Sequence, residues 1–337
     1  MSQAQPRKTE TSPEGEPRPA GQGGEGAFGW LLSHVARRRW FLERAYGPRN
    51  APFLKFVTPG HYYSPLPDGE AIHRDAAKLF DRSRKELPGI DLQAESQLAR
   101  LREWAPLHDA TEFRAEQTPG RRWYAKNGYF TYGDAVMLAC ILRATKPRRV
   151  VELGSGFSSA LMLDVDQHYL DGTTQWTFID PDPSRIDELL RDADRSRATI
   201  LQKLAQDLSP EWFDQLEAGD ILFIDSSHVG KIGSDVLYLF FEILPRLKPG
   251  VLIHVHDILW PFEYPQAWLE RGRAWNEAYF LRALLMHQRA YEIYCFGSYL
   301  ETHHRDALAQ YLPKSLADHG IPTTPSFSSI WLKKTAG

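Results

Sequence analysis

Cysteine is scarce in this 337-residue chain, which has only Cys140 and Cys295, far apart and without the spacing of metal-binding pairs. No apolar run approaches the roughly 20 residues of a membrane-spanning helix. The formal net charge is only −3, so no overall field favours nucleic acid or an anionic membrane. We interpret both cysteines as free thiols in a reducing cytoplasm and expect neither a membrane nor a nucleic-acid partner.

The first 26 residues lack the apolar core of a signal peptide and are rich in Pro, Gly, Glu and Ser. Such a segment buries too little apolar surface to offset the entropy lost on ordering, which predicts a disordered tail over residues 1–26. The chain as a whole is 42% apolar and 25% charged, as is ordinary for a soluble globular protein.

Residues 27–115 show helical periodicity in three stretches, 28–47, 71–87 and 92–108. An aromatic loop punctuated by Pro and Gly, residues 58–67, separates the first two. We predict a helical cap, lid or dimerisation element. A cap of this size often pairs with a second copy, so the oligomeric state stays open between monomer and homo-oligomer.

Residues 116–334 alternate between short apolar runs and helical segments. Nearly continuous apolar strands are typical of a parallel sheet covered by helices on both faces. The alternation predicts an α/β fold with a doubly wound, Rossmann-like sheet. The expected strands are 148–153, 175–180, 198–202, 220–225, 251–256, 291–299 and 328–334. The expected helices are 133–145, 157–169, 183–193, 209–216, 233–247 and one near 274–289.

The motif V-E-L-G-S-G-F-S-S closes the first of these strands. Glu152 precedes a turn formed by Gly154, Ser155 and Gly156, and Ser158 and Ser159 follow in the next helix. A dinucleotide fingerprint places a third glycine where Ser159 stands. A carboxylate before the glycines does not favour a phosphate, but it favours a ligand amine or ammonium. The glycines allow close approach of that ligand to the backbone.

This motif and the strand–helix order after it resemble the class I S-adenosylmethionine-dependent methyltransferases over about residues 116–334. The resemblance implies that the glycine turn passes the methionine part of the cofactor. It also implies that the late strand 328–334 is an antiparallel seventh strand. Cofactor-binding candidates that follow are Asp180, with Asp182 as an alternative, for the ribose, and Asp207 with Gln206 near the adenine.

A second polar group follows the fourth and fifth strands. Asp225 and His228 lie in I-D-S-S-H, and His256 and Asp257 end V-H-D. Neighbouring strand ends lie about 5 Å apart, so these side chains are expected to converge beside the cofactor, with Asp225 close enough to contact it. Asp225, His256 and Asp257 are candidate ligands of Mg²⁺, or of another divalent cation that imidazole favours. His228 is the candidate general base, and His254 is interpreted as a core residue.

These positions resemble the metal-dependent O-methyltransferases of the catechol type, the sugar O-methyltransferases of macrolide biosynthesis and the cephalosporin-hydroxylase-like group. His256 stands where the last two groups have an acid, and Ile258 where catechol-type enzymes have Asn, which leaves the presence and identity of a metal open. The aromatic stretch 260–268 is expected either to close over the site or to pack in the core. Tyr129, Thr131 and Asp134 are candidates for contacting the methionine carboxylate.

The sequence therefore predicts an S-adenosylmethionine-dependent O-methyltransferase, with metal assistance, that acts on a hydroxyl of a small molecule such as a sugar or natural product. Three alternatives stay open: a metal-independent methyltransferase with His228 as sole base, an NAD(P)-dependent oxidoreductase, and a non-catalytic cofactor-binding protein.

Overall fold

The structure is a computed structural model, and it describes residues 55–318, 320 and 325–335. The chain divides into two compact units, Met1–Leu79 and Phe80–Gly337. In the described part of the first unit, helix α2 spans Gly69–Leu79, and the carboxylate of Asp68 accepts the Ala71 N–H at 2.8 Å at its start. The tail predicted for residues 1–26 and the helix predicted for 28–47 lie outside the described residues.

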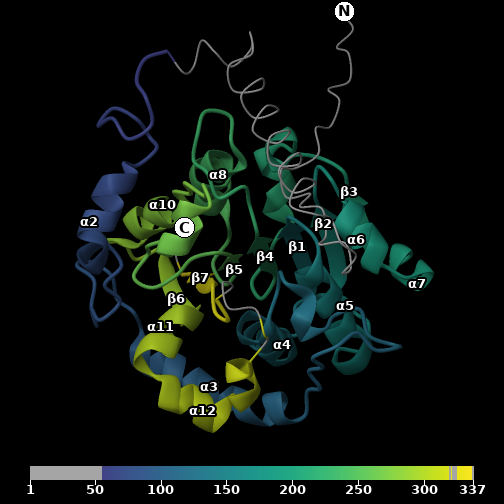
Figure 1. Cartoon of the computed structure of the whole chain (residues 1–337). Helices are drawn as coiled ribbons and strands as arrows, with labels where there is room; N and C mark the ends of the chain where they lie inside the picture. Colours follow the sequence, from purple (N-terminus) through teal and green to yellow (C-terminus); the bar gives the residue numbers. More distant parts are fainter. Residues whose placement is uncertain (1–54, 319, 321–324, 336–337) are drawn as a thin grey trace, which may run out of the picture. The chain divides into compact units, whose positions relative to one another are not determined.

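The second unit contains a seven-stranded sheet with the order β3-β2-β1-β4-β5-β7-β6 (Figure 1). Strands β1 to β5 pair in parallel, and β7 is antiparallel to both β5 and β6. The predicted α/β class and the antiparallel late strand are confirmed. The strands are β1 (Arg149–Leu153), β2 (Gln175–Ile179), β3 (Ala198–Leu201), β4 (Ile221–Ile224), β5 (Leu252–Val255), β6 (Tyr291–Phe296) and β7 (Ile330–Lys334).

The central strands β4 and β5 are buried at every position, which explains why their sequences are apolar without alternation. Strand β1 lies between β2 and β4, so the chain winds outward in one direction through β2 and β3 and in the other through β4 and β5. Ligands of such sheets bind at the carboxyl ends of the strands where the winding reverses. A ligand is therefore expected beyond Leu153 and Ile224.

The helix predicted after β1 is confirmed over Phe157–Tyr169, but the helix predicted for 183–193 breaks into two short pieces. The segment 233–247 changes from an α-helix to a π-turn and then to a 3-10 turn that includes Pro245. The helices α11 and α12 were not predicted. The α-helices of this unit are α3 (Ala94–Asp109), α4 (Tyr132–Thr145), α5 (Phe157–Tyr169), α6 (Ser184–Leu189), α7 (Asp192–Arg195), α8 (Asp235–Tyr238), α9 (Gln266–Glu270), α10 (Glu277–Leu285), α11 (Gly297–His303) and α12 (Arg305–Tyr311).

Shorter turns complete the unit. The helix predicted for 209–216 is a 3-10 turn. The N–H groups of Trp212 and Leu216 each donate to the carbonyl three residues earlier, those of Ser209 and Phe213. Helix α3 packs on α4, α12 and β6 (Figure 1). The 3-10 turns are η2 (Ala125–Asn127), η3 (Ala205–Asp207), η4 (Pro210–Gln215), η6 (Leu244–Arg246) and η7 (Pro313–Leu316), and the π-turn is η5 (Leu239–Ile243).

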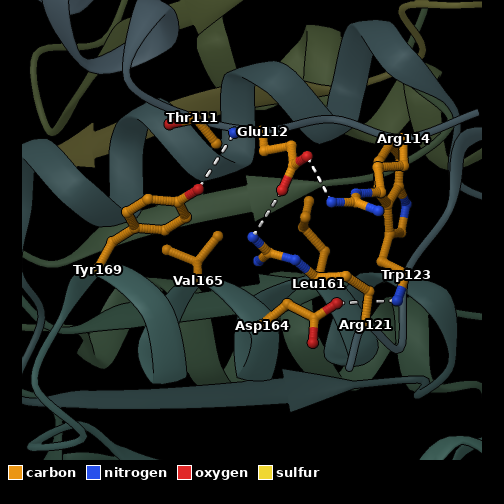
Figure 2. Close-up of a pocket in the computed structure, with 9 residues that line it drawn as sticks. All are labelled: Thr111, Glu112, Arg114, Arg121, Trp123, Leu161, Asp164, Val165 and Tyr169. Atoms are coloured by element: carbon orange, nitrogen blue, oxygen red, sulfur yellow. Dashed lines mark hydrogen bonds and ion pairs between the residues drawn. The ribbon is translucent and has the colours of Figure 1, made fainter. Parts of the chain in front are cut away.

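A buried ion network ties the segment before α4 to α5 and α7. The Arg122 guanidinium donates to both carboxylate oxygens of Asp194, at 2.8 and 2.5 Å, and to Asp164 at 2.7 Å. The backbone N–H of Trp123 also donates to Asp164, at 2.9 Å. Figure 2 shows the cavity of about 10 Å³ beside this segment, which Tyr169 helps to line. It has room for about one water, so we interpret the region as structural.

The two aromatic stretches differ in burial. Trp260, Phe262 and Tyr264 are buried in the core. Of the two expectations for residues 260–268, core packing therefore holds and closure over the site does not. Tyr62 and Tyr63, in the loop 58–67 of the first unit, are exposed. No helix in the described part of the chain is long and apolar enough to cross a membrane.

Candidate functional site

The glycine turn lies at the carboxyl end of β1, against the end of β4. Gly154 has a φ of +79°, in the left-handed region that favours glycine. A Cβ atom at this position would lie 2.1 Å from the backbone oxygen of Asp225. A Cβ on Gly156 would lie 2.9 Å from Cδ of Arg185. Both glycines are therefore required because the turn packs closely against Asp225 and Arg185.

Glu152 is fully buried below this turn. The hydroxyls of Ser158 and Ser159 donate to its two carboxylate oxygens, each at 2.5 Å. Burial raises the pKa of Glu152 to about 8, although the two hydroxyl bonds oppose that shift. A cationic ligand group beside this turn would favour the ionised carboxylate.

Ser159 has a second role at the start of α5. Its hydroxyl oxygen accepts the Gly156 N–H at 2.9 Å while its hydrogen is donated to Glu152. The serine in place of a third glycine thus links the turn, the helix start and the buried acid in one hydrogen-bond network.

Asp180 follows β2 and faces the same turn. Its carboxylate accepts the Ser155 N–H at 2.8 Å, the Ser155 hydroxyl at 3.1 Å and the Asp182 N–H at 2.8 Å. Burial raises the pKa of Asp180, and these bonds oppose the shift. The Asp182 carboxylate accepts the Ser184 N–H at 3.4 Å, at the first residue of α6. Asp180 therefore contacts the glycine turn directly, whereas Asp182 contacts the start of α6.

The residues predicted near the adenine lie in η3, after β3. Asp207 is exposed. The side-chain N–H of Gln206 donates to the Gly233 carbonyl at 3.0 Å, while its buried Oε1 has no hydrogen-bond partner. An unpaired buried acceptor is costly. Gln206 is therefore a better candidate than the exposed Asp207 for accepting a hydrogen bond from a ligand amine.

The predicted polar cluster assembles at the ends of β4 and β5. Nε2 of His228 lies 3.3 Å from Oδ1 of Asp225 and 3.6 Å from Oδ2 of Asp257. Nε2 of His256 lies 3.8 Å from Oδ1 of Asp257. His228 and Asp257 both have a positive φ, 59° and 54°, which is uncommon for residues other than glycine and concentrates at functional sites.

The two strand histidines differ. The His254 ring is stacked on the Phe223 ring, with 3.6 Å between the ring centroids, and neither ring nitrogen of His254 has a hydrogen-bond partner. Burial, followed by the nearby His256, holds the pKa of His254 well below its usual value, so it stays neutral in the core. Burial acts to lower the pKa of His256 too, but Asp225 and Asp257 outweigh it and raise that pKa.

The sequence reasoning missed Glu277, the first residue of α10. Its Oε2 lies 2.9 Å from Nδ1 of His228, and its Oε1 accepts the Ser226 hydroxyl at 2.9 Å. Trp275 lies over the His228 ring, with 4.3 Å between ring centroids. The only signal in the sequence was an acid at the start of the helix predicted for 274–289, which is also the ordinary place for an acid that stabilises a helix N-terminus.

The charges of this cluster are strongly coupled. Burial acts to lower the pKa of His228, but the bonds to Asp225 and Glu277 and the charge of Asp257 hold it well above the usual value. Burial raises the pKa of both Asp257 and Glu277. Burial acts to raise the pKa of Asp225, but the charge of His256 and the bond from His228 hold it below the ordinary value.

The predicted ligands Asp225, His256 and Asp257 do not form a metal site in this arrangement. Within residues 55–318, 320 and 325–335, no group of three or more His, Cys, Asp or Glu side chains is arranged to hold a metal ion. The imidazole of His228 instead lies within 4 Å of both carboxylates. A divalent ion does not fit there while His228 engages the same oxygens.

Asp134 is engaged elsewhere. Its carboxylate accepts the N–H and hydroxyl of Ser328, each at 2.9 Å, and the hydroxyl of Ser329 at 2.5 Å. This acid therefore joins the start of α4 to the residues before β7. Tyr129 is exposed, stacks on Phe157 and carries the Arg185 guanidinium 4.1 Å from its ring centroid.

Comparison with known proteins gives matches over the same region. Residues 151–258 match the sequence profile of a methyltransferase domain family. A protein of Archaeoglobus fulgidus described as uncharacterized is 33% identical over 169 residues, which cover 48% of this chain and 75% of that protein.

Two solved structures are similar at low identity. An apo structure of CmcI is 17% identical, with a TM-score of 0.37 over 61% of this chain and 72% of that one. The Podospora anserina methyltransferase PaMTH1, bound to SAH, is 16% identical, with a TM-score of 0.36 over 66% and 89% of the two chains. Similarity at this level transfers no ligand and no substrate.

The family match begins inside β1 and ends after β5, so it spans the glycine turn and the polar cluster. The sheet order and the antiparallel β7 are those expected from the resemblance of the glycine motif. The family matched over this region is a methyltransferase domain family, which gives no support to the oxidoreductase alternative. The chain therefore belongs to the class I S-adenosylmethionine-dependent methyltransferases.

Proposed function

We propose that the protein is an O-methyltransferase that transfers the methyl group of S-adenosylmethionine to a hydroxyl of a small molecule, with His228 as general base. The observation that carries the proposal is the position of His228. Its imidazole is held at the end of β4, where Asp225 joins the cluster to the glycine turn. In its neutral form, which the raised pKa of His228 shifts to higher pH, an imidazole at this place can take a proton from an attacking hydroxyl.

The residues around the glycine turn fit S-adenosylmethionine. Gly154 and Gly156 form a tight turn at the end of β1, and Glu152 is a buried acid beside it. When bound, the cofactor supplies a methyl carbon activated by the adjacent sulfonium. Glu152 would favour its positive charge, Asp180 would accept from the ribose hydroxyls, and Gln206 would accept from the adenine amine.

The reaction is a displacement at carbon: the substrate oxygen bonds to the methyl carbon as the carbon–sulfur bond breaks, and the hydroxyl proton passes to Nε2 of His228. The protein aligns oxygen, carbon and sulfur, and alignment of this kind supplies much of the barrier reduction. Asp225 and Asp257 stabilise the imidazolium formed when His228 takes the proton.

Metal assistance is a second candidate, supported by the convergence of Asp225, Asp257 and His256. An ion could occupy this place only after the His228 ring leaves the two carboxylates.

The acceptor class and the domain roles are also proposals. We propose a hydroxylated sugar or natural-product scaffold as acceptor, with residues 27–115 as a cap that shapes its pocket and residues 116–334 as the methyltransferase domain. We further propose that the protein acts in the cytoplasm without a nucleic-acid or membrane partner, and that the cap is the surface for any homo-oligomer.

The test combines a substrate search with a variant. A panel of hydroxylated compounds is incubated with the full chain and methyl-labelled cofactor, and mass spectrometry locates the label. His228→Ala should retain binding of S-adenosylhomocysteine by calorimetry and lose most turnover. His168→Ala, at an exposed position on α5, is the matched control. Turnover by His228→Ala at the wild-type rate would refute the base assignment, and label on nitrogen or carbon would refute O-methylation.

A further inference from the structure

Glu277 hydrogen-bonds to the loop after β4 that carries His228, which a carboxylate that only stabilises a helix N-terminus would not do. The side chain is fully buried at the start of α10. One carboxylate oxygen lies 2.9 Å from Nδ1 of His228, and the other accepts the Ser226 hydroxyl at 2.9 Å. A buried carboxylate in water-free surroundings is costly unless both oxygens are paired, and here both pair with the loop that carries the base.

The backbone repeats the same connection. The carbonyl of His228 accepts the N–H groups of Asn276 and Glu277, at 3.1 and 3.2 Å. The Ser226 hydroxyl also accepts the His228 N–H at 3.1 Å. The first turn of α10 therefore holds the base residue by its main chain and by its ring, at a residue whose φ of 59° needs such support.

We propose that Glu277 is a positioning residue that fixes the orientation and the tautomer of His228. The inference rests on the proposed function, in which His228 takes the proton of the substrate hydroxyl. By accepting a hydrogen bond from Nδ1, Glu277 keeps the hydrogen of the neutral imidazole on that nitrogen. Nε2, on the side of Asp225 and Asp257, then carries the lone pair that the reaction uses.

The chemistry of this pair follows the general logic of an oriented imidazole. A carboxylate behind the ring restrains rotation about χ2. Because Glu277 lies 2.9 Å from Nδ1 while Asp225 lies 3.3 Å from Nε2, the shorter contact favours hydrogen on Nδ1 over the tautomer with hydrogen on Nε2, which cannot accept a proton there. Trp275 covers one face of the ring, which limits tilting. Neither Trp275 nor Ser226 can select a tautomer at Nδ1, so this role falls to Glu277.

The first test needs no methyl acceptor. The full chain is labelled with nitrogen-15 histidine and saturated with S-adenosylhomocysteine, and the two ring nitrogens of His228 are assigned by the loss of their signals in His228→Gln. Because the pKa of His228 is raised, the spectra are recorded at a pH above it, where the ring is neutral, and the hydrogen is expected on Nδ1 of the wild type. Glu277→Gln keeps an acceptor oxygen and should retain this tautomer, whereas Glu277→Ala should shift the ring toward the other tautomer or a mixture.

A structural role alone would leave these signals in place. Ser226→Ala removes the second hydrogen bond of Glu277 and the acceptor of the His228 N–H but leaves the contact at Nδ1, so it should keep the wild-type tautomer. The inference is overturned if folded Glu277→Ala shows the same ring-nitrogen signals as the wild type. If Glu277→Ala does not fold, the comparison of Glu277→Gln with Glu277→Leu in the same spectra decides, since only Gln offers an acceptor.

The second test measures turnover with the acceptor found in the labelled-cofactor panel. Glu277→Ala should lower kcat by about 10- to 100-fold, the range known for residues that orient a functional imidazole, with the KM for the cofactor unchanged. Glu277→Gln should recover part of that loss. Asp194→Asn, at a buried acid of the Arg122 network away from this loop, should lower stability and leave kcat unchanged.

The two proposals fail in different ways. If His228→Ala is inactive and Glu277→Ala keeps the wild-type kcat, the positioning role is wrong and the base assignment stands. If His228→Ala keeps full turnover, the base assignment fails, whatever the spectra of the Glu277 variants show.

Discussion

The backbone oxygen of Asp225 lies so close to Gly154 that a Cβ atom there would be 2.1 Å away. Asp225 also donates its N–H to the Leu153 carbonyl at 2.8 Å. The glycine turn and the strand end that carries the polar cluster are thus in direct contact. In the proposed function, donor binding and acceptor chemistry would share this piece of backbone.

Gly154→Ala should therefore destabilise the protein and weaken binding of S-adenosylhomocysteine. The added methyl must displace backbone while the residue keeps a positive φ, and the two costs together are about 2 to 4 kcal/mol in free energy of unfolding. Gly219→Ala is the matched control, because Gly219 has a φ of +88° and open space around its Cβ position. Strain alone there costs about 1 kcal/mol. Equal losses in denaturant titrations of the two variants would contradict the close contact.

Glu152→Gln should change how stability depends on pH. Burial raises the pKa of Glu152 to about 8 in the folded protein, against 4.5 for the ordinary group. The folded state holds this proton more tightly, so the contribution is fully present below pH 4.5 and is lost as pH rises toward 8. The loss is at most ~5 kcal/mol. Because Gln cannot ionise, the variant should gain stability relative to wild type across that window.

The measurement for this change is a series of denaturant titrations of the ligand-free protein between these pH values. Glu188→Gln, at an exposed position of α6, removes the same charge without the burial and should follow the wild-type profile. A constant difference between Glu152→Gln and wild type at all pH values would show that Glu152 does not titrate in this range.

Arg122→Ala should unfold more easily by about 3 to 5 kcal/mol, because it leaves the carboxylates of Asp164 and Asp194 buried without their cation. Arg195→Ala breaks the exposed pair with Asp187, and it should cost no more than about 1 kcal/mol. Thermal melts of the two variants with wild type check the contrast. Similar melting temperatures would mean that the network contributes no more than a surface pair.

Chelation tests the fit of a metal. We expect turnover to be unchanged after EDTA treatment, because the His228 imidazole engages the two carboxylates that an ion would need. Metal add-back to the treated enzyme is the control. Loss of turnover in chelator, restored by one divalent ion, would favour the second candidate mechanism and would require the His228 ring to move.

Much of the fold was predictable because periodicity and stop signals are local. Phe157–Tyr169 matches the predicted helix, since the glycine turn ends the strand and a helical pattern begins at once. The segment 233–247 was predicted as one helix and is irregular, because Pro245 lacks the N–H that an α-helix needs. Helices α11 and α12 were missed, as the strand pattern before them was read through to residue 299.

The candidate site divides in the same way. Asp225, His228 and Asp257 stood out because they follow apolar strands, and parallel strands bring their ends together. Glu277 lies 49 residues after His228 and follows no strand, so no spacing rule connects the two. Their contact depends on how α10 packs on the loop, which is a tertiary fact.

The sequence by itself determined the sheet, the glycine turn and the strand ends at which polar residues gather, because these follow from local pattern and from the geometry of parallel strands. Only the tertiary structure decided which side chains pair. In the structure, Asp134 accepts hydrogen bonds from the serines before β7, and the aromatic stretch 260–268 is buried. The His228 ring has Asp225 and Asp257 beside Nε2 and Glu277 beside Nδ1. Such pairing depends on distances of a few ångströms between distant segments, which burial and packing set and no local pattern encodes.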